Sequence, residues 1–219
     1  MNANVIGKCA RMMTVGAIVT MALAAPAQAQ LNGENLLGDM GVKAGSQPEP
    51  GVYLSNIYYR YFTDTIKDPN GNRIQIDPTG QAKQTIQAGM PLVYYVSKQK
   101  LFGANFGAMA VLPIAKGSLE APGYGLSEEV STGLSDMYVM PAQLGWHFTR
   151  GDASAGLGLF IPTGRYKAGA DDNLGKGMWS YEVSGGGTLY LDKTRSVSLS
   201  TMAYWETHSK KDGQQQLGP

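Results

Sequence analysis

The two histidines are the first residues to consider for catalysis, because a hydrolytic nucleophile needs a base beside it. His147 and His208 are far apart in the chain, and the sequence has no Gly-x-Ser-x-Gly elbow to supply a nucleophile. We therefore expect both histidines to be solvated or to face an interior passage. The sequence predicts a protein that is not an enzyme.

Metal and phosphate sites are also poorly supported. Residues 68–72 begin like a calcium loop, but Arg73 stands where the turn glycine belongs and no glutamate occupies the twelfth position. Residues 171–173 (Asp-Asp-Asn) could contact a cation, although a solvated loop explains them better. Gly185-Gly186-Gly187 is not followed by a helix and does not resemble a phosphate cradle. The sequence predicts no cofactor and no metal site.

The remaining chemistry belongs to polar side chains that share one face of several predicted strands. Mixed charges and hydrogen-bonding groups on such a face would support a wet passage. We expect this face to carry Arg60, Asn105, Gln143, His147, Glu182, Tyr190, Tyr204 and Glu206. Gly103, Gly107, Gly156 and Gly158 would leave room there for a planar ligand. Alternatively, the polar groups satisfy one another in a closed, structural barrel.

These residues must be positioned by strands, since segments of about ten to fifteen residues separate polar turns from long loops. The predicted strands are 51–62, 84–96, 101–113, 136–148, 153–163, 179–191 and 196–207. The tight turns are 97–100, 149–152 and 192–195, and the long loops are 63–80, 115–133 and 164–178. Asn70-Gly71 predicts a hairpin inside the first loop, so that the first two strands continue as a ribbon. This layout is typical of an outer-membrane barrel.

Alternation of apolar and polar residues is clearest in the last three strands. Val183 and Leu189, for example, alternate with Glu182 and Thr188. An apolar face toward lipid explains this pattern, and so does a soluble sandwich with one face on a core. Aromatic residues near both ends of the strands favour the membrane, because Trp and Tyr gather at its two interfaces. Two prolines inside predicted strands, Pro91 and Pro141, are expected to mark bulges or shifted boundaries.

The ends of the chain predict export and an incomplete barrel. Residues 1–29 have the basic start, short apolar core and Ala-Gln-Ala site of a cleavable signal peptide. Removing its Lys8 and Arg11 changes the formal charge from +1 to −1, which argues against nucleic acid as a partner. Its Cys9 is the only cysteine. Residues 30–49 are expected to form an irregular segment that could plug the lumen, and 50–219 a C-terminally incomplete barrel domain.

Four stretches resemble a family of proteobacterial outer-membrane proteins linked to the meta-pathway of phenol degradation. They are the entry to the first strand, a strand built as Asp-x4-Pro-x2-Leu-x-Trp, a Pro-Thr-Gly-x-Tyr strand end and an Asn-Leu-Gly loop before a tryptophan. The matching residues are Pro50, Gly51, Tyr53, Asp136, Pro141, Trp146, Pro162, Thr163, Gly164, Tyr166, Asn173, Gly175 and Trp179. The likeness covers roughly residues 48–208.

The resemblance implies a channel or transporter-like barrel for small hydrophobic or aromatic compounds in the bacterial outer membrane. Its partners would be that solute, membrane lipid and lipopolysaccharide. We therefore expect an all-β, antiparallel, up-and-down transmembrane β-barrel, of which about seven strands form the N-terminal part of a larger barrel. Closure by several copies of the chain is the alternative to a fragment. A structural or interaction barrel without an open pore is the alternative function.

Overall fold

The computed structural model describes residues 41–67, 71–74, 82–170 and 172–211. The predicted signal peptide, with Cys9, lies outside these residues. The elements are η1 (Gly41–Lys43), β1 (Gly51–Thr63), β2 (Ile66–Lys67), β3 (Arg73–Ile74), β4 (Lys83–Leu101), β5 (Ala104–Val111), β6 (Ile114–Ala121), η2 (Pro122–Tyr124), β7 (Leu126–Leu134), β8 (Met137–Phe148), β9 (Gly151–Ile161), β10 (Ser180–Tyr190) and β11 (Ser198–His208). Among them is no helix of the length and apolar character that crossing a membrane requires.

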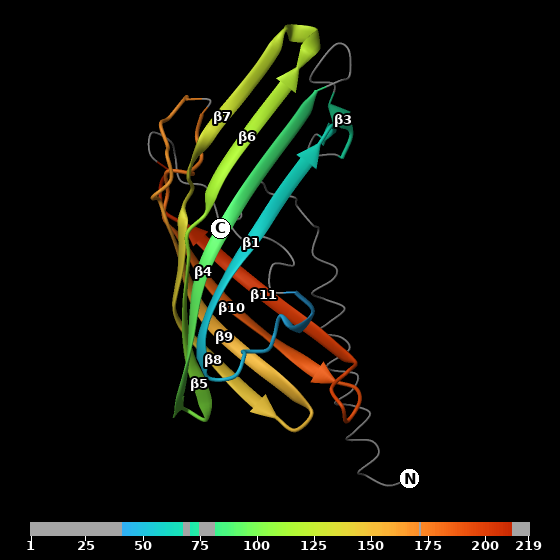
Figure 1. Ribbon diagram of the computed structural model, residues 1–219, viewed down its shortest axis with the longest axis vertical. Helices are drawn as coiled ribbons and strands as arrows, with labels where there is room; N and C mark the ends of the chain where they lie inside the picture. The colour runs from blue at the N-terminus through green and yellow to red at the C-terminus, as the bar shows by residue number, and fades with distance from the viewer. Residues whose placement is uncertain (1–40, 68–70, 75–81, 171, 212–219) are drawn as a thin grey trace. The chain divides into compact units, whose positions relative to one another are not determined.

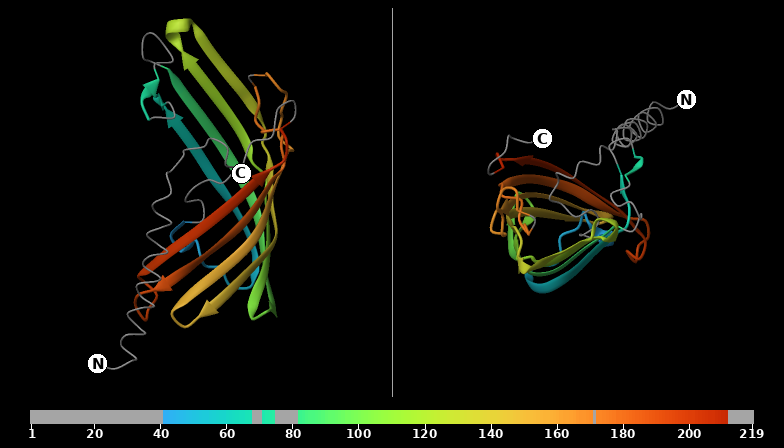
Figure 2. Two further views of the ribbon diagram at one scale, coloured as in Figure 1. Left: turned by 180° about the vertical axis from the view of Figure 1, so that it is seen from behind. Right: turned by 90° about the horizontal axis from the view of Figure 1, so that it is seen from above.

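Nine of these strands form one antiparallel sheet, which confirms the predicted all-β antiparallel class, although about seven strands were predicted. Its order is β11-β10-β9-β8-β5-β4-β6-β7, and β1 pairs with the free edge of β4. The sheet curls around its inner face, as the view along the strands in Figure 2 shows. The short strands β2 and β3 pair separately, with Ile66 opposite Ile74, so the hairpin predicted beyond the first strand is confirmed.

The β4 strand organises the sheet because it is 19 residues long. Its first half pairs with β6 and its second half with β5, and Leu112-Pro113 separates these two strands in the chain. Figure 1 shows β6 and β7 rising past the ends of β8–β11 along the upper half of β4. The prediction of a loop over 115–133 was therefore wrong. Backbone pairing of β6 with the long β4, and of β7 with β6, makes strands of residues rich in Glu, Ser and Gly.

Both prolines lie at irregular places in the ladder. Pro91 stands between the residues of β4 that pair with β6 and those that pair with β5, and its carbonyl accepts a hydrogen bond from Leu112 N at 3.0 Å. Pro141 lies within register shifts against both neighbours of β8. A missing N–H is tolerated at such positions.

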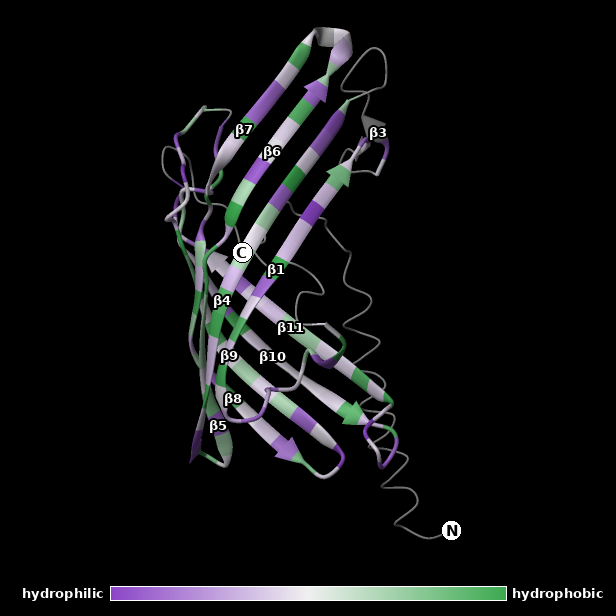
Figure 3. Ribbon diagram, in the orientation of Figure 1, coloured by the Kyte–Doolittle hydropathy of each residue, from purple (hydrophilic) through white to green (hydrophobic). Residues whose placement is uncertain are grey.

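The two faces of the curled sheet have different chemistry. On β10, Ser180, Glu182 and Ser184 are buried on the inner face, whereas Tyr181 and Val183 are exposed on the outer face. Figure 3 shows apolar and polar bands alternating along the strands. The aromatic residues divide between the faces. Exposed aromatics at or near strand ends are Tyr53, Tyr61, Phe62, Phe102, Phe148, Trp179, Tyr181 and Trp205, whereas Tyr58 and Tyr95 are exposed within β1 and β4.

The first tight turn differs from its prediction. β4 continues through 97–100 to Leu101, and the chain reverses at Phe102-Gly103, where both residues have positive φ, 51° and 79°. A register shift between Val96 and Lys100 absorbs the extra length, and Asn105 Nδ2 donates to Ser97 O there at 2.9 Å. The Lys-rich stretch looked like a turn because its charges are exposed, but it forms the end of a strand.

The turn between β10 and β11 is held by Asp192. Its carboxylate accepts hydrogen bonds from the Thr194 hydroxyl, from Val197 N at 2.7 Å and from Ser196 N at 3.1 Å. These donors, the Thr194 hydroxyl above all, favour the charged form and lower the pKa of Asp192 to about 2. This contribution to the turn is present above the ordinary pKa of an aspartate and is lost as the pH falls through about 2.

Thr194→Ala is expected to raise the pKa of Asp192 toward the ordinary value of 3.8, because it removes the donor with the largest effect. The measurement is an NMR titration of the Asp192 side-chain carboxyl carbon. Lys193→Ala is the matched control, since Lys193 is not among the groups that lower this pKa. An unchanged titration in Thr194→Ala would show that the two backbone donors alone hold the carboxylate.

Candidate functional site

The inner face encloses a cavity of about 880 Å³. Its wall is largely apolar and includes four methionines that come from four different strands, namely Met90, Met109, Met140 and Met202. Ile57 and Tyr59 of β1, Phe160 of β9 and Leu174 of the loop before β10 complete the apolar part. A cavity of this size and composition can hold a small organic molecule.

Polar groups occupy the part of the cavity formed by β8 and β10. Gln143 is buried, and its amide oxygen accepts hydrogen bonds from the Tyr94 hydroxyl and from Gln47 Nε2, the latter at 3.2 Å. Glu182 is also buried and accepts a hydrogen bond from the Tyr138 hydroxyl at 2.8 Å. These acceptors give one side of an apolar cavity a polar surface.

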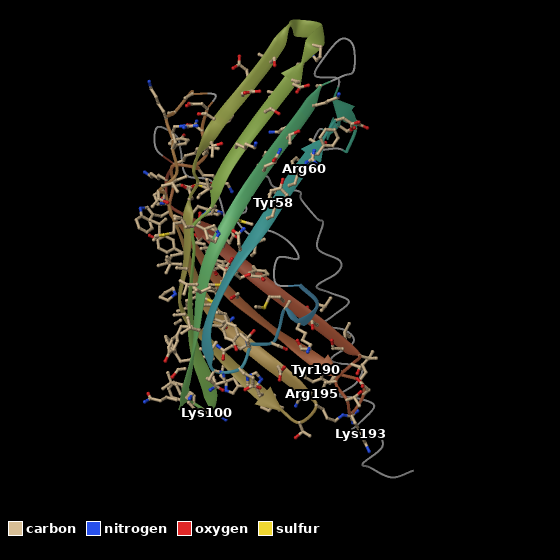
Figure 4. The ribbon with its side chains drawn as sticks, viewed as in Figure 1. Tyr58, Arg60, Lys100, Tyr190, Lys193 and Arg195 are labelled. Atoms are coloured by element: carbon tan, nitrogen blue, oxygen red, sulfur yellow. The ribbon has the colours of Figure 1, made fainter. Side chains whose placement is uncertain are left out.

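A second cluster lies at the end of the sheet where the short turns are. Asp152 is buried, and its carboxylate accepts hydrogen bonds from the hydroxyls of Tyr190 at 2.6 Å and Ser46 at 2.7 Å. His147 Nδ1 lies 3.1 Å from the same carboxylate. The Arg195 guanidinium lies over the Tyr190 ring, 4.7 Å from its centre. Figure 4 shows Tyr190 and Arg195 at this end, near Lys193. The cluster fixes side chains from β8, β9 and β10.

Residues 41–47 lie against the inner face at the level of this cluster. A Cβ on Gly45 would come within 2.2 Å of the Gly187 backbone, so the backbones of these two segments are in direct contact there. Gln47 covers Gly107 and Gly145, because a Cβ on either glycine would meet its side chain at 2.7 and 2.5 Å. Ser200 Oγ donates to Val42 O at 2.8 Å. This segment therefore fills part of the interior beside the cavity.

The loop between β9 and β10 is clamped by Asp136. Its carboxylate accepts hydrogen bonds from Gly164 N at 3.0 Å and from Lys176 N at 2.7 Å, and these bonds join the two ends of the loop. A Cβ on Gly175 would lie 2.6 Å from Asp136 Oδ1, so only glycine allows this approach. The clamp positions Leu174, which packs beside Met90 at the wall of the cavity.

Other family-motif residues support the same loop and its surroundings. Asn173 bonds to Lys167 N and to Lys167 O and Ala170 O, which shapes the loop tip. Thr163 Oγ1 accepts from Met137 N at 3.0 Å. Trp146 Nε1 donates to Phe102 O at 3.1 Å. The motifs thus describe contacts between strands and the loop.

One arrangement resembles a catalytic set. Ser180 Oγ lies 2.8 Å from His208 Nδ1, and His208 Nε2 lies 3.9 Å from Glu206 Oε2. Ser180 is 0% exposed, so a substrate does not reach its hydroxyl. The three side chains join β10 to β11 rather than forming an accessible nucleophile. Among the described residues, no three His, Cys, Asp or Glu side chains come together as metal ligands do.

The structure separates the residues predicted for the inner face into groups. Gln143, Glu182 and Tyr204 line the cavity. His147 and Tyr190 belong to the Asp152 cluster, Asn105 is buried at the β4 bulge, and Glu206 lies beside His208.

Arg60 does not lie on the inner face. It is paired with Gln87, whereas the adjacent pair Tyr59 and Ala88 lines the cavity, so Arg60 points to the opposite side of the sheet. Figure 4 shows it on β1 near Tyr58, whose hydroxyl donates to Gln87 Oε1 at 3.2 Å. The predicted facing of Arg60 was wrong because four of the five residues from Tyr58 to Phe62 are aromatic and give no alternation.

The predicted space above the glycines is also filled. Gln47 covers Gly107, the Tyr138 ring packs over Gly158, and Met140 and Ser184 approach Gly156. Gly103 lies in the turn after β4. The room for a ligand is instead provided by the wider cavity between the methionines.

The methionines of the cavity and Asp152 were not predicted from the sequence. Met202 lies two residues from Tyr204 and from Ser200, so strict alternation would have placed it on the inner face. Met140 was hidden by the bulge at Pro141, which breaks the alternation. Asp152 was assigned to a turn, although it is the second residue of β9.

Comparison with known proteins adds a family and a fold. The sequence model of a family described as "Putative MetA-pathway of phenol degradation" matches residues 63–218. Among solved structures, the crystal structure of an outer membrane channel from Pseudomonas putida F1 superposes with a TM-score of 0.65 at 20% identity. The match covers 82% of this chain and 62% of that chain. At this identity the likeness shows the fold. No curated protein sequence matches the chain.

Proposed function

The chain belongs to the protein family whose description is the MetA-pathway of phenol degradation. From this membership we propose that it is an outer-membrane channel or transporter-like barrel for small hydrophobic or aromatic compounds. The observation that carries the proposal is the cavity of about 880 Å³ with its apolar, methionine-rich wall on the inner face of a curled sheet. A solute that enters this space leaves water for a surface that suits an aromatic ring.

The outer face supports a location in a membrane. Val183, Leu189 and Leu199 are each about half or more exposed on it, and exposed aromatic rings lie toward both ends of the strands. β9, β10 and β11 each have 11 residues, the length that spans a bilayer when tilted. In this proposal residues 1–29 direct export, and membrane lipid and lipopolysaccharide surround the barrel. Nucleic acid is not a partner.

A structural or interaction barrel without an open pore is the second candidate. It is favoured by residues 41–47, which cover Gly107, Gly145 and Gly187 on the inner face. If this segment stays in place, it narrows the interior beside the Asp152 cluster. The two candidates differ in whether solutes cross.

The test is single-channel recording of the full-length protein refolded in planar bilayers, with and without phenol. A transporter-like channel is expected to show a defined conductance that phenol reduces, because the aromatic would occupy the cavity that ions cross. Folding is checked in the same preparation by the heat-dependent shift of the barrel on gels. A folded protein that shows no current and no uptake of an aromatic solute into liposomes would support the structural barrel instead.

A further inference from the structure

The end of the sheet where the short turns lie carries a group of exposed basic side chains. At this end β4 joins β5, β8 joins β9 and β10 joins β11. Figure 4 shows Lys100, Lys193 and Arg195 there. Within the part of the chain that the structure describes, no member of the group forms an ion pair with a carboxylate. We call the group the short-turn cations, and its members are Lys98, Lys100, Arg150, Lys193 and Arg195.

The acidic side chains at the same end do not balance this charge. Asp152 is buried in its cluster with Tyr190. The Asp192 carboxylate accepts hydrogen bonds from within its own turn. Glu49, which precedes β1, is exposed, but Lys43 adds a further positive charge 5.7 Å from the centre of the Tyr190 ring. The surface that this end presents is therefore basic.

Arg195 is the fixed member of the short-turn cations. Its guanidinium lies over the Tyr190 ring and donates from Nη2 to Phe148 O at 3.2 Å, which ties the turn between β10 and β11 to the end of β8. Its φ is 58°, a left-handed conformation that residues other than glycine adopt rarely. A guanidinium has five N–H donors in a planar fork, so donors remain for an anion beside the one given to Phe148. Backbone and packing thus hold a phosphate-binding group at an exposed position.

Exposed apolar side chains lie directly beside these cations. Phe102, in the turn after β4, is 83% exposed, and Phe148, at the end of β8, is 57% exposed. Leu191 and Val197 flank the turn between β10 and β11 and are also exposed. An apolar band followed by basic side chains matches the order of acyl chains and head groups in a membrane, where long basic side chains reach the phosphates. An acidic protein partner does not account for the apolar band.

We propose that the short-turn cations form a binding surface for the phosphate groups of anionic phospholipids, with Arg195 as its fixed contact. In an outer-membrane barrel the short turns face the periplasm. The leaflet on that side consists of phospholipids, whereas lipopolysaccharide occupies the leaflet at the long loops. The Arg195 fork suits paired phosphate oxygens, and the lysines supply point charges around it.

The inference rests on the proposed function for the membrane location alone and does not depend on conduction. It identifies a lipid-binding surface outside the cavity and the charge of the lipid that this surface binds. Each basic residue near an anionic membrane surface adds about a fivefold preference, so the group predicts a selectivity for anionic over zwitterionic lipid.

The tryptophans provide a reporter for each end of the sheet. Trp146 Nε1 donates to Phe102 O at 3.1 Å beside the short turns, and Gln143 of the same strand lines the cavity, so alternation places Trp146 on the outer face. Trp179 and Trp205 are exposed toward the long-loop end. Because the sequence has three tryptophans, Trp179→Phe with Trp205→Phe leaves Trp146 alone, and Trp146→Phe leaves the other two.

The test places both reporter proteins in phosphatidylcholine vesicles that contain brominated phosphatidylglycerol or brominated phosphatidylcholine at the same mole fraction. Bromine quenches the fluorescence of a tryptophan that the lipid contacts, so the two quenching curves give the relative affinity. The Trp146 reporter is expected to prefer phosphatidylglycerol by about fivefold or more. This preference is expected to fall in about 1 M salt, where the Debye length is about 3 Å. The reporter with Trp179 and Trp205 is expected to show about a twofold preference or less.

Two sets of substitutions in the Trp146 reporter assign the preference to the short turns. Lys98→Gln, Lys100→Gln and Lys193→Gln together are expected to reduce it to about twofold or less, because they remove most of the mobile positive charge at this end. The matched control removes three exposed cations toward the long-loop end and is expected to leave the preference unchanged. Its substitutions are Arg60→Gln, Lys83→Gln and Lys167→Gln.

Arg195→Lys tests the fixed contact separately. It keeps the charge but loses the planar fork, so the preference is expected to fall about twofold or more while its salt dependence remains. Folding of every variant is checked by the heat-dependent shift of the barrel on gels. A preference equal to that of the unsubstituted reporter would show that charge alone, and not the fork, is recognised, and would contradict the role given to Arg195.

Equal quenching by the two lipids in the Trp146 reporter would overturn the proposal and leave the basic surface to an acidic macromolecule. An equal preference in both reporters would contradict its location at the short turns. A preference for phosphatidylglycerol in a protein that passes no current would support this inference and contradict the proposed channel, whereas conduction without the preference would do the reverse. A folded protein in which neither lipid quenches either reporter would contradict the membrane location on which both rest.

Discussion

Asp136→Ala is expected to release the loop between β9 and β10 and to lower the stability of the folded protein by about 3 kcal/mol. Asp136 is 7% exposed and is the acceptor for both Gly164 N and Lys176 N. Alanine leaves these two N–H groups without their partner, and an orphaned buried donor costs about 1–3 kcal/mol. A loss of this size is a large share of the net stability of a domain.

Limited trypsin digestion measures the effect directly. The loop contains Arg165, Lys167 and Lys176, so its release is expected to speed cleavage at these sites and to lower the temperature at which the folded band disappears on gels. Asp172→Ala is the matched control, since Asp172 pairs with Arg165 at 3.1 Å on the surface and such pairs contribute little. Equal resistance of Asp136→Ala and the wild type would show that other contacts hold the loop.

This clamp illustrates what the sequence could and could not predict. The similarity to the family singled out Asp136, Gly164 and Gly175, and the family match confirms that resemblance. Nothing in the spacing of these residues showed that one carboxylate joins them, because the contacts close a loop between distant strands. The geometry gives the physical reason for the motif: both glycines approach Asp136 too closely for a Cβ.

Strand prediction succeeded where alternation was regular. β9, β10 and β11 lie within two residues of their predicted bounds, and their inner and outer faces agree with the predicted pattern. It failed for β6 and β7, whose pairing depends on the length of β4 rather than on apolar residues of their own. A local pattern does not report the length of a distant partner strand.

The inner face shows the same limit at the level of single residues. Glu182 and Tyr204 could be placed by period-two alternation because their strands have no bulge. Arg60 could not, since aromatic residues occupy both faces of that part of β1 and only the pairing of Tyr59 with Ala88 sets the register. Met140 required knowledge of the bulge at Pro141.

Gly45→Val is expected to displace residues 41–47 from the inner face and to raise single-channel conductance severalfold. A Cβ at Gly45 would lie 2.2–2.4 Å from three backbone atoms of Gly187, and a strand backbone cannot move aside as a flexible side chain can. The absence of a side chain at Gly45 is what permits this close approach in the wild type. Displacement would also break the bonds from Ser46 to Asp152 and from Gln47 to Gln143.

The measurement is the conductance of the refolded protein in planar bilayers, beside a variant that lacks residues 30–47. Both changes are expected to act in the same direction, because each removes the segment that covers Gly107 and Gly145. Gly89→Ala is the matched control, since nothing lies within 4 Å of a Cβ at that position. If Gly45→Val and the deletion both leave the conductance unchanged, the segment does not limit passage, and any pore must run through the cavity beside it.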